Sequence, residues 1–420
     1  MILRVNTRQL TAFQLIYTIF AVQWINTFRN ITILPLVADG INILLIILVL
    51  RKQETETRVV VRFWNTVNIV LVFEIILGVL QFADNGFLKG PLLLFWSLRM
   101  FFRPFLIMLC TEKSITVHDL KKIDSFILPL NFLHLILAAI QFYIFGLRYD
   151  WNGGIFGAVQ GCNGLVNIFY CVLIAYTVLR YFSKEKKLLE VVIVLVSAMI
   201  VAYWSELKFL YIEIIVIVLL AIIINRLSLR TLLLCVGFFV FIGLIFPKMT
   251  DFLPDNFNQL YDIEALISYN NSAYNETGRG FISRGNGLDI IRSEINNDSI
   301  FRTILGNGLG SANSLSFFNI SSQIEITDGW RNYNFFSLTF MVIEMGYLGV
   351  IAFLIIFLML AICYVKIKDN FYKTFGLLLI VITCINIWYN SSWIIDNTAY
   401  MLSFFMAIPL IQLKNESKSR

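Results

Sequence analysis

Apolar runs close to the length of a membrane-spanning helix recur along most of this chain of 420 residues. Hydrophobic residues make up 58% of the chain and charged residues only 14%, whereas soluble domains contain about 25% charged residues. A helix needs about 20 predominantly apolar residues to cross a bilayer. The sequence therefore predicts an all-α polytopic membrane protein with about 12 transmembrane helices, which we place at 10–28, 31–50, 63–82, 91–109, 124–147, 163–181, 188–204, 206–224, 231–247, 334–364, 371–389 and 393–413.

One polar segment interrupts the series of spans. It extends from Thr250 to Tyr333, between the ninth and the tenth span. A transporter needs only helices and short turns to move its cargo, so a long insert on one face indicates chemistry or recognition at the membrane surface. We divide the chain into residues 1–249 with helices 1–9, a large loop at 250–333, and residues 334–420 with helices 10–12 and a tail.

The basic residues predict the orientation in the membrane, because cytoplasmic loops retain an excess of Lys and Arg. One set of alternate loops, which includes both termini, holds 21 of the 33 Lys and Arg residues. Both termini are therefore expected in the cytoplasm and the 250–333 loop outside it. This bias also accounts for the net charge of +6, so the charge does not indicate a nucleic-acid partner. The first span lacks a small-residue cleavage site and is expected to remain as a helix.

Cysteine and histidine are too few and too scattered to predict a metal or disulfide site. Of the six cysteines only Cys162 falls in an outer loop, and the chain has no CxxC pair. The two histidines, His118 and His134, are remote in sequence from the 250–333 loop. We therefore predict no metal and no cofactor.

The 250–333 loop carries arginine but no lysine. Outer loops exclude basic charge in general, which explains a low number of bases but not the choice of arginine. Arginine binds phosphate and carboxylate in a bidentate fork and keeps its proton, so its exclusive use favours a phosphorylated substrate. The five bases are Arg279, Arg284, Arg292, Arg302 and Arg331.

Two stretches of the loop, 258–268 and 288–295, have the periodicity of short helices. In the second, Leu288, Ile291 and Ile295 share one face. Arg284 precedes this helix and Arg292 lies off its apolar face. We expect small helices that lie across the mouth of the transmembrane bundle.

A glycine-rich run, Gly306-Asn-Gly-Leu-Gly310, follows these helices. Its backbone could approach a ligand closely or form an anion-binding nest. No Gly-Lys-Ser/Thr follows, so the run is not a P-loop, and a simple turn remains the alternative.

Charged residues also occur within and beside the spans. Arg99 and Arg103 are four residues apart and share a helix face, with Glu74 at comparable depth in the preceding span. Intramembrane charge usually faces the bundle interior and has a partner. A structural Glu74–Arg99 pair is one interpretation, and arginines that line a route for a lipid diphosphate are the other. Arg148 lies just outside a span, where it could reach lipid headgroups or share an anion with the 250–333 loop.

Several motifs follow one another in an order known from one superfamily. They are Arg148 with Gly153-Gly154-Ile-Phe-Gly157 and Asn163 in one outer loop, then Thr277-Gly-Arg279, Ser283-Arg284, Gly306-Asn-Gly-Leu-Gly310, Asn334-Phe-Phe and Glu344-Met-Gly346-Tyr-Leu-Gly349. This arrangement resembles the O-antigen ligase and Wzy-type polymerase superfamily. The ligase branch has a His-Asn pair where this chain has Tyr333-Asn334, which favours the polymerase branch.

The resemblance implies a GT-C-like membrane glycosyltransferase in the bacterial cytoplasmic membrane. Such an enzyme moves a glycan from undecaprenyl diphosphate onto an acceptor, without a nucleotide sugar or an obligatory metal. The implied partners are the lipid-linked donor and acceptor, membrane lipid, a flippase and a chain-length regulator. A ligase, a lipid-linked oligosaccharide flippase or another transporter, and a membrane scaffold remain as alternatives.

The candidate site residues follow from these patterns and from the resemblance. We expect Arg148 and Arg284 to clamp the diphosphate and stabilise the charge that develops on it. Spacing leaves open whether Arg279 or Arg284 matches the arginine of the superfamily, but an apolar helix follows Arg284 at once. The predicted substrate-binding residues are Asn163, Arg292, Gly306, Gly308, Gly310, Asn334, Arg99 and Arg103.

Overall fold

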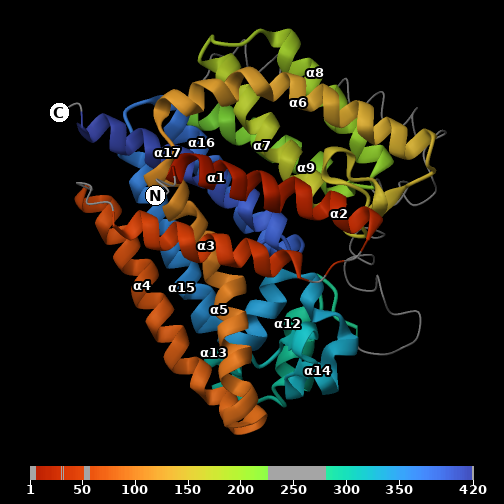
Figure 1. Ribbon diagram of the computed structural model, residues 1–420, viewed down its shortest axis with the longest axis vertical. Helices are drawn as coiled ribbons and strands as arrows, with labels where there is room; N and C mark the ends of the chain where they lie inside the picture. The colour runs from red at the N-terminus through yellow and green to blue at the C-terminus, as the bar shows by residue number, and fades with distance from the viewer. Residues whose placement is uncertain (1–5, 30, 32, 52–56, 226–280, 419–420) are drawn as a thin grey trace, which may run out of the picture.

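The computed structural model describes residues 6–29, 31, 33–51, 57–225 and 281–418, and the part it describes is built mainly of helices (Figure 1). The ninth predicted span at 231–247 and loop residues 250–280 lie outside the described residues, and so do the predicted helix at 258–268 and Arg279. The long helices are α1 (Thr7–Ile16), α2 (Val22–Phe28), α3 (Leu34–Leu50), α4 (Arg58–Gly78), α5 (Phe82–Ser114), α6 (Val117–Tyr143), α7 (Asn163–Phe182), α8 (Leu188–Trp204), α9 (Lys208–Asn225), α15 (Ser337–Val365), α16 (Asn370–Tyr389) and α17 (Asp396–Lys418).

Every predicted span that lies in the described residues coincides with a helix, although the ends differ by several residues. Within the described part, five helical stretches are long and apolar enough to cross a membrane: Arg58–Ser114, Val117–Tyr143, Asn163–Phe182, Ser337–Val365 and Asn370–Tyr389. Shorter apolar helices lie at Leu34–Leu50 and Leu188–Trp204. The prediction of an all-α chain with membrane-spanning helices is confirmed at this level.

Local sequence signals explain where several helices begin. Asn6 caps α1, since its side chain accepts a hydrogen bond from the Arg8 N–H. Thr116 and Asp119 form a reciprocal capping box at the start of α6. The Asp369 carboxylate accepts from the first N–H groups of α16. Each cap satisfies N–H groups that have no partner within the helix.

Two helices contain sharp breaks at glycine. The chain turns at Gly86, whose φ of 77° lies in the left-handed region. As a result α4 and α5 lie side by side and meet at the lower end of the view in Figure 1. Gly346 breaks α15 in the same way, with a φ of 62°.

Helix α7 forms the centre of one half of the molecule and is buried along most of its length. It packs against α8, α9, α16 and α17, while α6 packs on α8. In the other half α15 packs on α4, and α17 packs on α5. Helices α16 and α17 contact both groups and join them (Figure 1). The two ends of the chain lie on the same side of the view.

The described part of the outer segment, residues 281–333, consists of short elements. Its helices are α12 (Gly287–Ile290), which continues as a π turn at Ile291–Ile295, α13 (Ile300–Leu305) and α14 (Gln323–Asp328). Strands β1 (Ser314–Leu315) and β2 (Ile320–Ser321) form a small antiparallel hairpin around the 3-10 turn Ser316–Phe318. Ile291 and Ile295 are buried and Arg292 is exposed, so the predicted second helix and its apolar face are confirmed.

Candidate functional site

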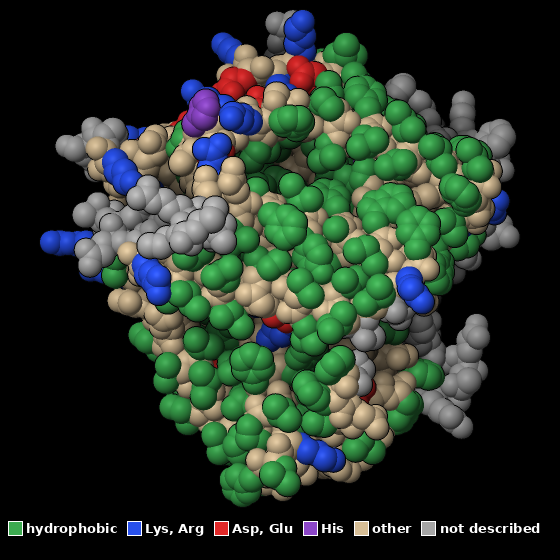
Figure 2. All heavy atoms as spheres, in the orientation of Figure 1, with side chains coloured by type: hydrophobic (Ala, Val, Ile, Leu, Met, Phe, Trp, Pro, Cys, Tyr) green, Lys and Arg blue, Asp and Glu red, His purple; other side chains and the backbone are tan. Residues whose placement is uncertain are grey.

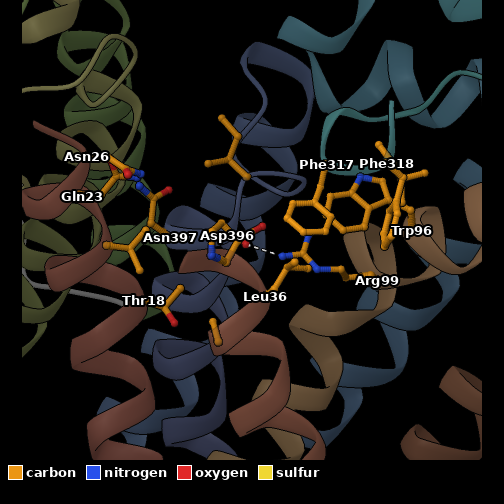
Figure 3. Close-up of a pocket in the computed structure, with 15 residues that line it drawn as sticks. Thr18, Gln23, Asn26, Leu36, Trp96, Arg99, Phe317, Phe318, Asp396 and Asn397 are labelled. Carbon is orange, nitrogen blue, oxygen red and sulfur yellow. Dashed lines mark hydrogen bonds and ion pairs between the residues drawn. The ribbon is translucent and has the colours of Figure 1, made fainter. Parts of the chain in front are cut away.

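A pocket of about 380 Å³ lies between α2 with the π turn before it (Tyr17–Ala21), α3, α5, the start of α17 and the β1–β2 hairpin. Figure 3 shows Arg99 beside Trp96, Phe317 and Phe318, while Gln23, Asn26 and Asn397 lie across the pocket from them. The lining therefore combines an arginine and the Asp396 carboxylate paired with it, an aromatic wall and a group of amides. The apolar remainder of the lining is Val22, Pro35, Leu36, Ala38, Leu315 and Ile395.

Two arginines and two aspartates form a closed charge cluster at this pocket, here called the charge quartet: Asp39, Arg99, Arg103 and Asp396. Arg99 donates from Nη2 to Asp396 Oδ2 at 2.7 Å and from Nε to Asp39. Arg103 pairs with the same two carboxylates. The arginine side chains are only 8% and 3% exposed. Opposite charges thus balance within the cluster, as buried ions require.

The predicted Glu74–Arg99 pair is wrong, because Arg99 pairs with Asp39 and Asp396 instead. Both aspartates fall inside spans predicted from the sequence, at 31–50 and 393–413. The rule that singled out Arg99, that intramembrane charge needs a partner, could therefore have found them too. Sequence spacing does not identify the pairing, since the partners are 60 and 297 residues from Arg99.

A polar network behind the charge quartet fixes Arg103. Its guanidinium carbon lies 5.3 Å from the centroid of the Tyr400 ring. The Tyr400 hydroxyl accepts a hydrogen bond from Gln14 Nε2 at 3.2 Å and another from Asn42. Gln14, Asn42 and Tyr400 are all buried. This packing positions Arg103 as a support for Arg99, which alone of the two lines the pocket.

Arg99 retains hydrogen-bonding capacity toward the pocket. A guanidinium has five N–H donors, and the two bonds to Asp39 and Asp396 come from Nε and Nη2. The guanidinium carbon also lies 4.4 Å from the Trp96 ring centroid, which fixes the plane of the fork. The remaining donors can reach a ligand oxygen without loss of either ion pair.

Aromatic side chains at the mouth of the pocket were missed by the sequence reasoning. Phe317 and Phe318 lie at the tip of the β1–β2 hairpin and are 55% and 57% exposed. Their rings meet edge to face at 5.1 Å. Nothing in the local sequence distinguishes them from the many other aromatic residues of the chain.

The surface around the charged recess is apolar. Figure 2 shows basic and acidic side chains at the bottom of a recess, just below the position of α3 in Figure 1, within a face covered mainly by hydrophobic side chains. An apolar surface with one charged opening suits an amphipathic ligand, whose tail stays in lipid while its polar head enters.

Arg284 belongs to the outer segment and contacts the end of α16. One loop connects that end to Asp396 of the charge quartet. The Arg284 Nε donates to the Tyr389 carbonyl oxygen at 2.9 Å. Its guanidinium carbon lies 4.0 Å from the Tyr389 ring centroid and 5.2 Å from that of Phe336. The segment after Tyr389 leads directly to Asp396 at the start of α17. Arg284 is therefore held on the outer segment next to the loop that enters the pocket.

Arg148 lies in the loop before α7 and is exposed. Its guanidinium carbon lies 5.3 Å from the Phe142 ring centroid. In the same loop Asn163 donates from Nδ2 to Asp150 Oδ1 at 2.5 Å. Arg148 therefore packs on the Phe142 ring, whereas Arg284 packs on the Tyr389 ring, so different aromatic side chains hold the two predicted clamp residues.

The other described arginines of the outer segment pair with carboxylates. Because their charges are matched locally, the use of arginine in this segment has a structural explanation besides phosphate binding. The pairs are Arg292–Asp298 at 3.8 Å, Arg302–Asp84 at 3.5 Å, and Arg331 with Glu294 at 2.5 Å and Asp328 at 2.8 Å. Arg292 and Asp298 are both exposed, so their pair is loose.

The glycine run packs into the break of α15 rather than forming an open anion nest. The N–H groups that follow Gly306 donate to the carbonyl oxygens of Ile343 and Glu344, both at 2.9 Å. A Cβ on Gly306 would lie 2.3 Å from the Glu344 carbonyl oxygen, and one on Gly310 would lie 2.6 Å from the α5 backbone. Gly306, Gly308 and Gly310 all have positive φ. The expectation of a nest is corrected on this ground.

Tyr333 and Asn334 differ sharply in their surroundings. Asn334 is exposed. Tyr333 is buried, and two acceptors lie within reach of its single hydroxyl proton, Glu325 Oε2 at 2.5 Å and the Ala312 carbonyl oxygen at 2.9 Å. Burial and the neighbouring Glu325 carboxylate hold the pKa of Tyr333 well above its usual value. The phenol is therefore a fixed donor within the outer segment and not a base at neutral pH.

Comparisons with protein-family models and with curated proteins find no match to this chain. Among the residues the structure describes, no three His, Cys, Asp or Glu side chains gather as a metal site. The pocket, the charge quartet and the order of the outer motifs are the features of the chain that bear on its function.

Proposed function

We propose that this chain is a membrane glycosyltransferase that polymerises undecaprenyl-diphosphate-linked oligosaccharide repeat units at the outer face of the bacterial cytoplasmic membrane. Its product would be an O-antigen, a capsule or an exopolysaccharide. The observation that carries the proposal is the pocket, because it joins an arginine, aromatic rings and amides within an apolar surface. A lipid-linked glycan presents phosphate, sugar rings and a hydrocarbon tail to match these three features.

The order of the outer motifs supports the polymerase class. In this account twelve helices cross the membrane, both termini are cytoplasmic, and the 250–333 segment lies outside. The described elements of that segment supply the hairpin with Phe317 and Phe318 at the pocket mouth. The pocket would then be accessible from the outer leaflet, where flipped repeat units arrive.

The chemical demand is the departure of a diphosphate from the anomeric carbon while an acceptor hydroxyl attacks. Negative charge develops on the leaving oxygens, and guanidinium donors already held in place stabilise that charge. Arg99 is fixed by Asp39, Asp396 and Trp96. Arg284, held at Tyr389, is the second candidate donor. No general base is assigned.

A transporter is the second candidate, favoured by the charge quartet. Paired charges inside a membrane protein are common on ion and substrate pathways. A flippase for lipid-linked oligosaccharides would use the same pocket to admit a head group. The two functions give different products in cells.

A strain that lacks this chain separates the candidates by the glycan it makes. Loss of a polymerase leaves the flippase and any ligase intact, so we expect single repeat units and no ladder of longer chains on a gel. Loss of a flippase would remove outer glycan altogether. Loss of a ligase would leave long polymer on the lipid carrier, and either of these results would contradict the proposal.

Complementation then tests the residues. Arg148→Ala combined with Arg284→Ala should leave single units, since removal of one preorganised donor typically lowers the rate about 10²–10³-fold. Trp96→Ala and Phe317→Ala should shorten the ladder. Phe301→Ala is the matched control, because Phe301 is as exposed as Phe317 but does not line the pocket. A normal ladder from the Trp96 and Phe317 variants would show that the pocket takes no part in polymerisation.

A further inference from the structure

Two buried carboxyl groups lie close to each other where α4 packs on α15. They belong to Glu74 and Glu344, and both residues are 0% exposed. The two groups are close enough to interact electrostatically. A Cβ on Gly349 would lie 3.0 Å from Glu74 Oε1, so the Glu74 side chain points at α15 just beyond its break.

Hydrogen bonding accounts for only one of the four carboxyl oxygens. Glu344 Oε1 accepts from the Ala312 N–H at 3.1 Å and from Asn313 Nδ2 at 3.2 Å. Glu344 Oε2 and both oxygens of Glu74 are buried and have no donor in the described structure. An acceptor without a donor costs about 1–3 kcal/mol when buried, and more when it is charged.

No described cation compensates for these groups. The nearby arginines of α5, Arg99 and Arg103, are engaged by Asp39 and Asp396. Neither Glu74 nor Glu344 forms an ion pair with any residue that the structure describes.

The other titratable groups near this contact also have partners. The Tyr333 hydroxyl of the outer segment interacts electrostatically with Glu344, but its proton lies between Glu325 and the Ala312 carbonyl oxygen. At the other end of α5, Glu112 accepts from Trp64 Nε1. Two negative charges side by side in a dry interior are strongly disfavoured, since like charges that share a site do not both ionise.

We infer that Glu74 and Glu344 together hold one proton, which Glu74 carries. The added proton neutralises the carboxyl group that has no donor on either oxygen and makes it a donor itself. It also reduces the charge of the pair from two to one. The remaining charge rests on Glu344, whose Oε1 already accepts two hydrogen bonds.

The shared proton would join three parts of the molecule. Glu344 holds the outer segment through Ala312 and Asn313, and its backbone carbonyl accepts from Gly308 at 2.9 Å. Glu74 connects the region around Glu344 to α4. The proton site therefore anchors the glycine run and the break of α15 to the helix bundle. This inference does not depend on the proposed function.

Infrared spectroscopy of the purified full chain tests the inference, because a protonated carboxyl has a C=O stretch that a carboxylate lacks. At neutral pH the spectrum of the wild type minus that of Glu74→Gln should show this band, with an intensity of one carboxyl per chain. Glu344→Gln should keep the band but change its frequency, because Glu74 stays buried without a cation while the neighbouring carboxylate is removed. This frequency change tests the contact between the two groups if Glu74→Gln fails to fold.

Glu190→Gln is the control, because the Glu190 carboxylate accepts from Lys186 and the Lys187 N–H and should contribute no band. Persistence of the full band in Glu74→Gln, or a band of unchanged frequency in Glu344→Gln, would overturn the inference. So would a thermal stability of the wild type that requires sodium or potassium ions, since a bound cation would then replace the proton.

Discussion

At the scale of single residues, the charge quartet explains how this chain can bury two arginines inside an apolar protein. Each arginine contacts both aspartates, so neither charge is left uncompensated. Removal of one partner from a buried pair costs about 3–5 kcal/mol, because it leaves the other charge buried alone. The cluster is therefore a strong constraint on the relative positions of α3, α5 and α17.

Arg103→Ala tests this constraint. Arg103 is only 3% exposed, so we expect the free energy of unfolding to fall by about 3–5 kcal/mol. Denaturant or thermal unfolding in detergent measures the change. Arg103→Ala combined with Asp396→Asn balances the charge again and should lose less than the single change. Equal stability of wild type and Arg103→Ala would show that the quartet does not hold these helices together.

At the residue scale, the sequence was enough to single out the buried arginines but not to identify their ion-pair partners. Arg99 and Arg103 were singled out because charge inside a span is costly. Their true partners come from distant helices, and Glu74 turned out to face a second acid. Such pairings depend on which helices become neighbours, and that information is not contained in local spacing.

At the scale of secondary-structure elements, the break of α15 positions the outer segment. Gly346 and Gly306 approach each other closely. A Cβ on Gly346 would lie 2.3 Å from the Ile304 carbonyl oxygen, and a Cβ on Gly306 would lie 2.3 Å from the Glu344 carbonyl oxygen. Helical periodicity located α15, but it did not locate this break. The glycine run was noticed for a possible ligand, whereas its backbone N–H groups serve the fold.

Gly306→Ala and Gly346→Ala should both destabilise the chain. Each position combines a positive φ with an extended ψ, a region essentially confined to glycine that costs another residue about 1–3 kcal/mol, and the steric overlap adds to this. Thermal unfolding of the purified protein measures the loss. Gly164→Ala is the control, because Gly164 is helical and a Cβ there meets nothing within 4 Å. An unfolding temperature unchanged in the first two variants would contradict the packing described here.

The contact between α17 and the start of α16 should weaken in acid. Partial burial tends to raise the pKa of Glu416, but the N–H groups of Lys368 and Asp369, which donate at 2.9 and 3.1 Å, outweigh this and lower it. A lowered pKa in the folded state stabilises the fold at neutral pH, and this stabilisation is lost as the pH falls through that pKa.

Hydrogen exchange of the Lys368 and Asp369 amides measures this contact. We expect their protection to decrease below about pH 4, the range in which a glutamate ordinarily titrates. Glu416→Gln should make protection lower at neutral pH and nearly independent of pH. Protection that increases on acidification of the wild type would reverse the sign and contradict the assignment.

At the scale of the whole molecule, the length and period of apolar runs were enough to predict the helices. Long apolar segments have few alternatives in a bilayer, where backbone groups must be satisfied internally. The arrangement of the helices was not predictable, because α7, α16 and α17 are all similarly apolar and nothing in their sequences states which one is central. The orientation in the membrane remains a prediction from the distribution of basic residues.

Cysteine labelling tests that orientation. A membrane-impermeant maleimide should label Gln323→Cys in intact cells, and Lys368→Cys only after the membrane is opened. The chain without an added cysteine is the background control. Burial raises the pKa of Cys162 to about 12, so this native thiol should react slowly. Protection of Gln323→Cys in intact cells would place the pocket mouth in the cytoplasm and contradict the account.

The most direct test of the central claim is elongation by the purified chain itself. A strain without this chain should accumulate lipid-linked single repeat units, which provide the substrate whatever their sugars are. We predict that the full chain, reconstituted in vesicles with these extracted units, converts them into longer glycans that remain linked to the carrier lipid. Units that stay single, or that only move across the bilayer, would show that the chain is not the polymerase.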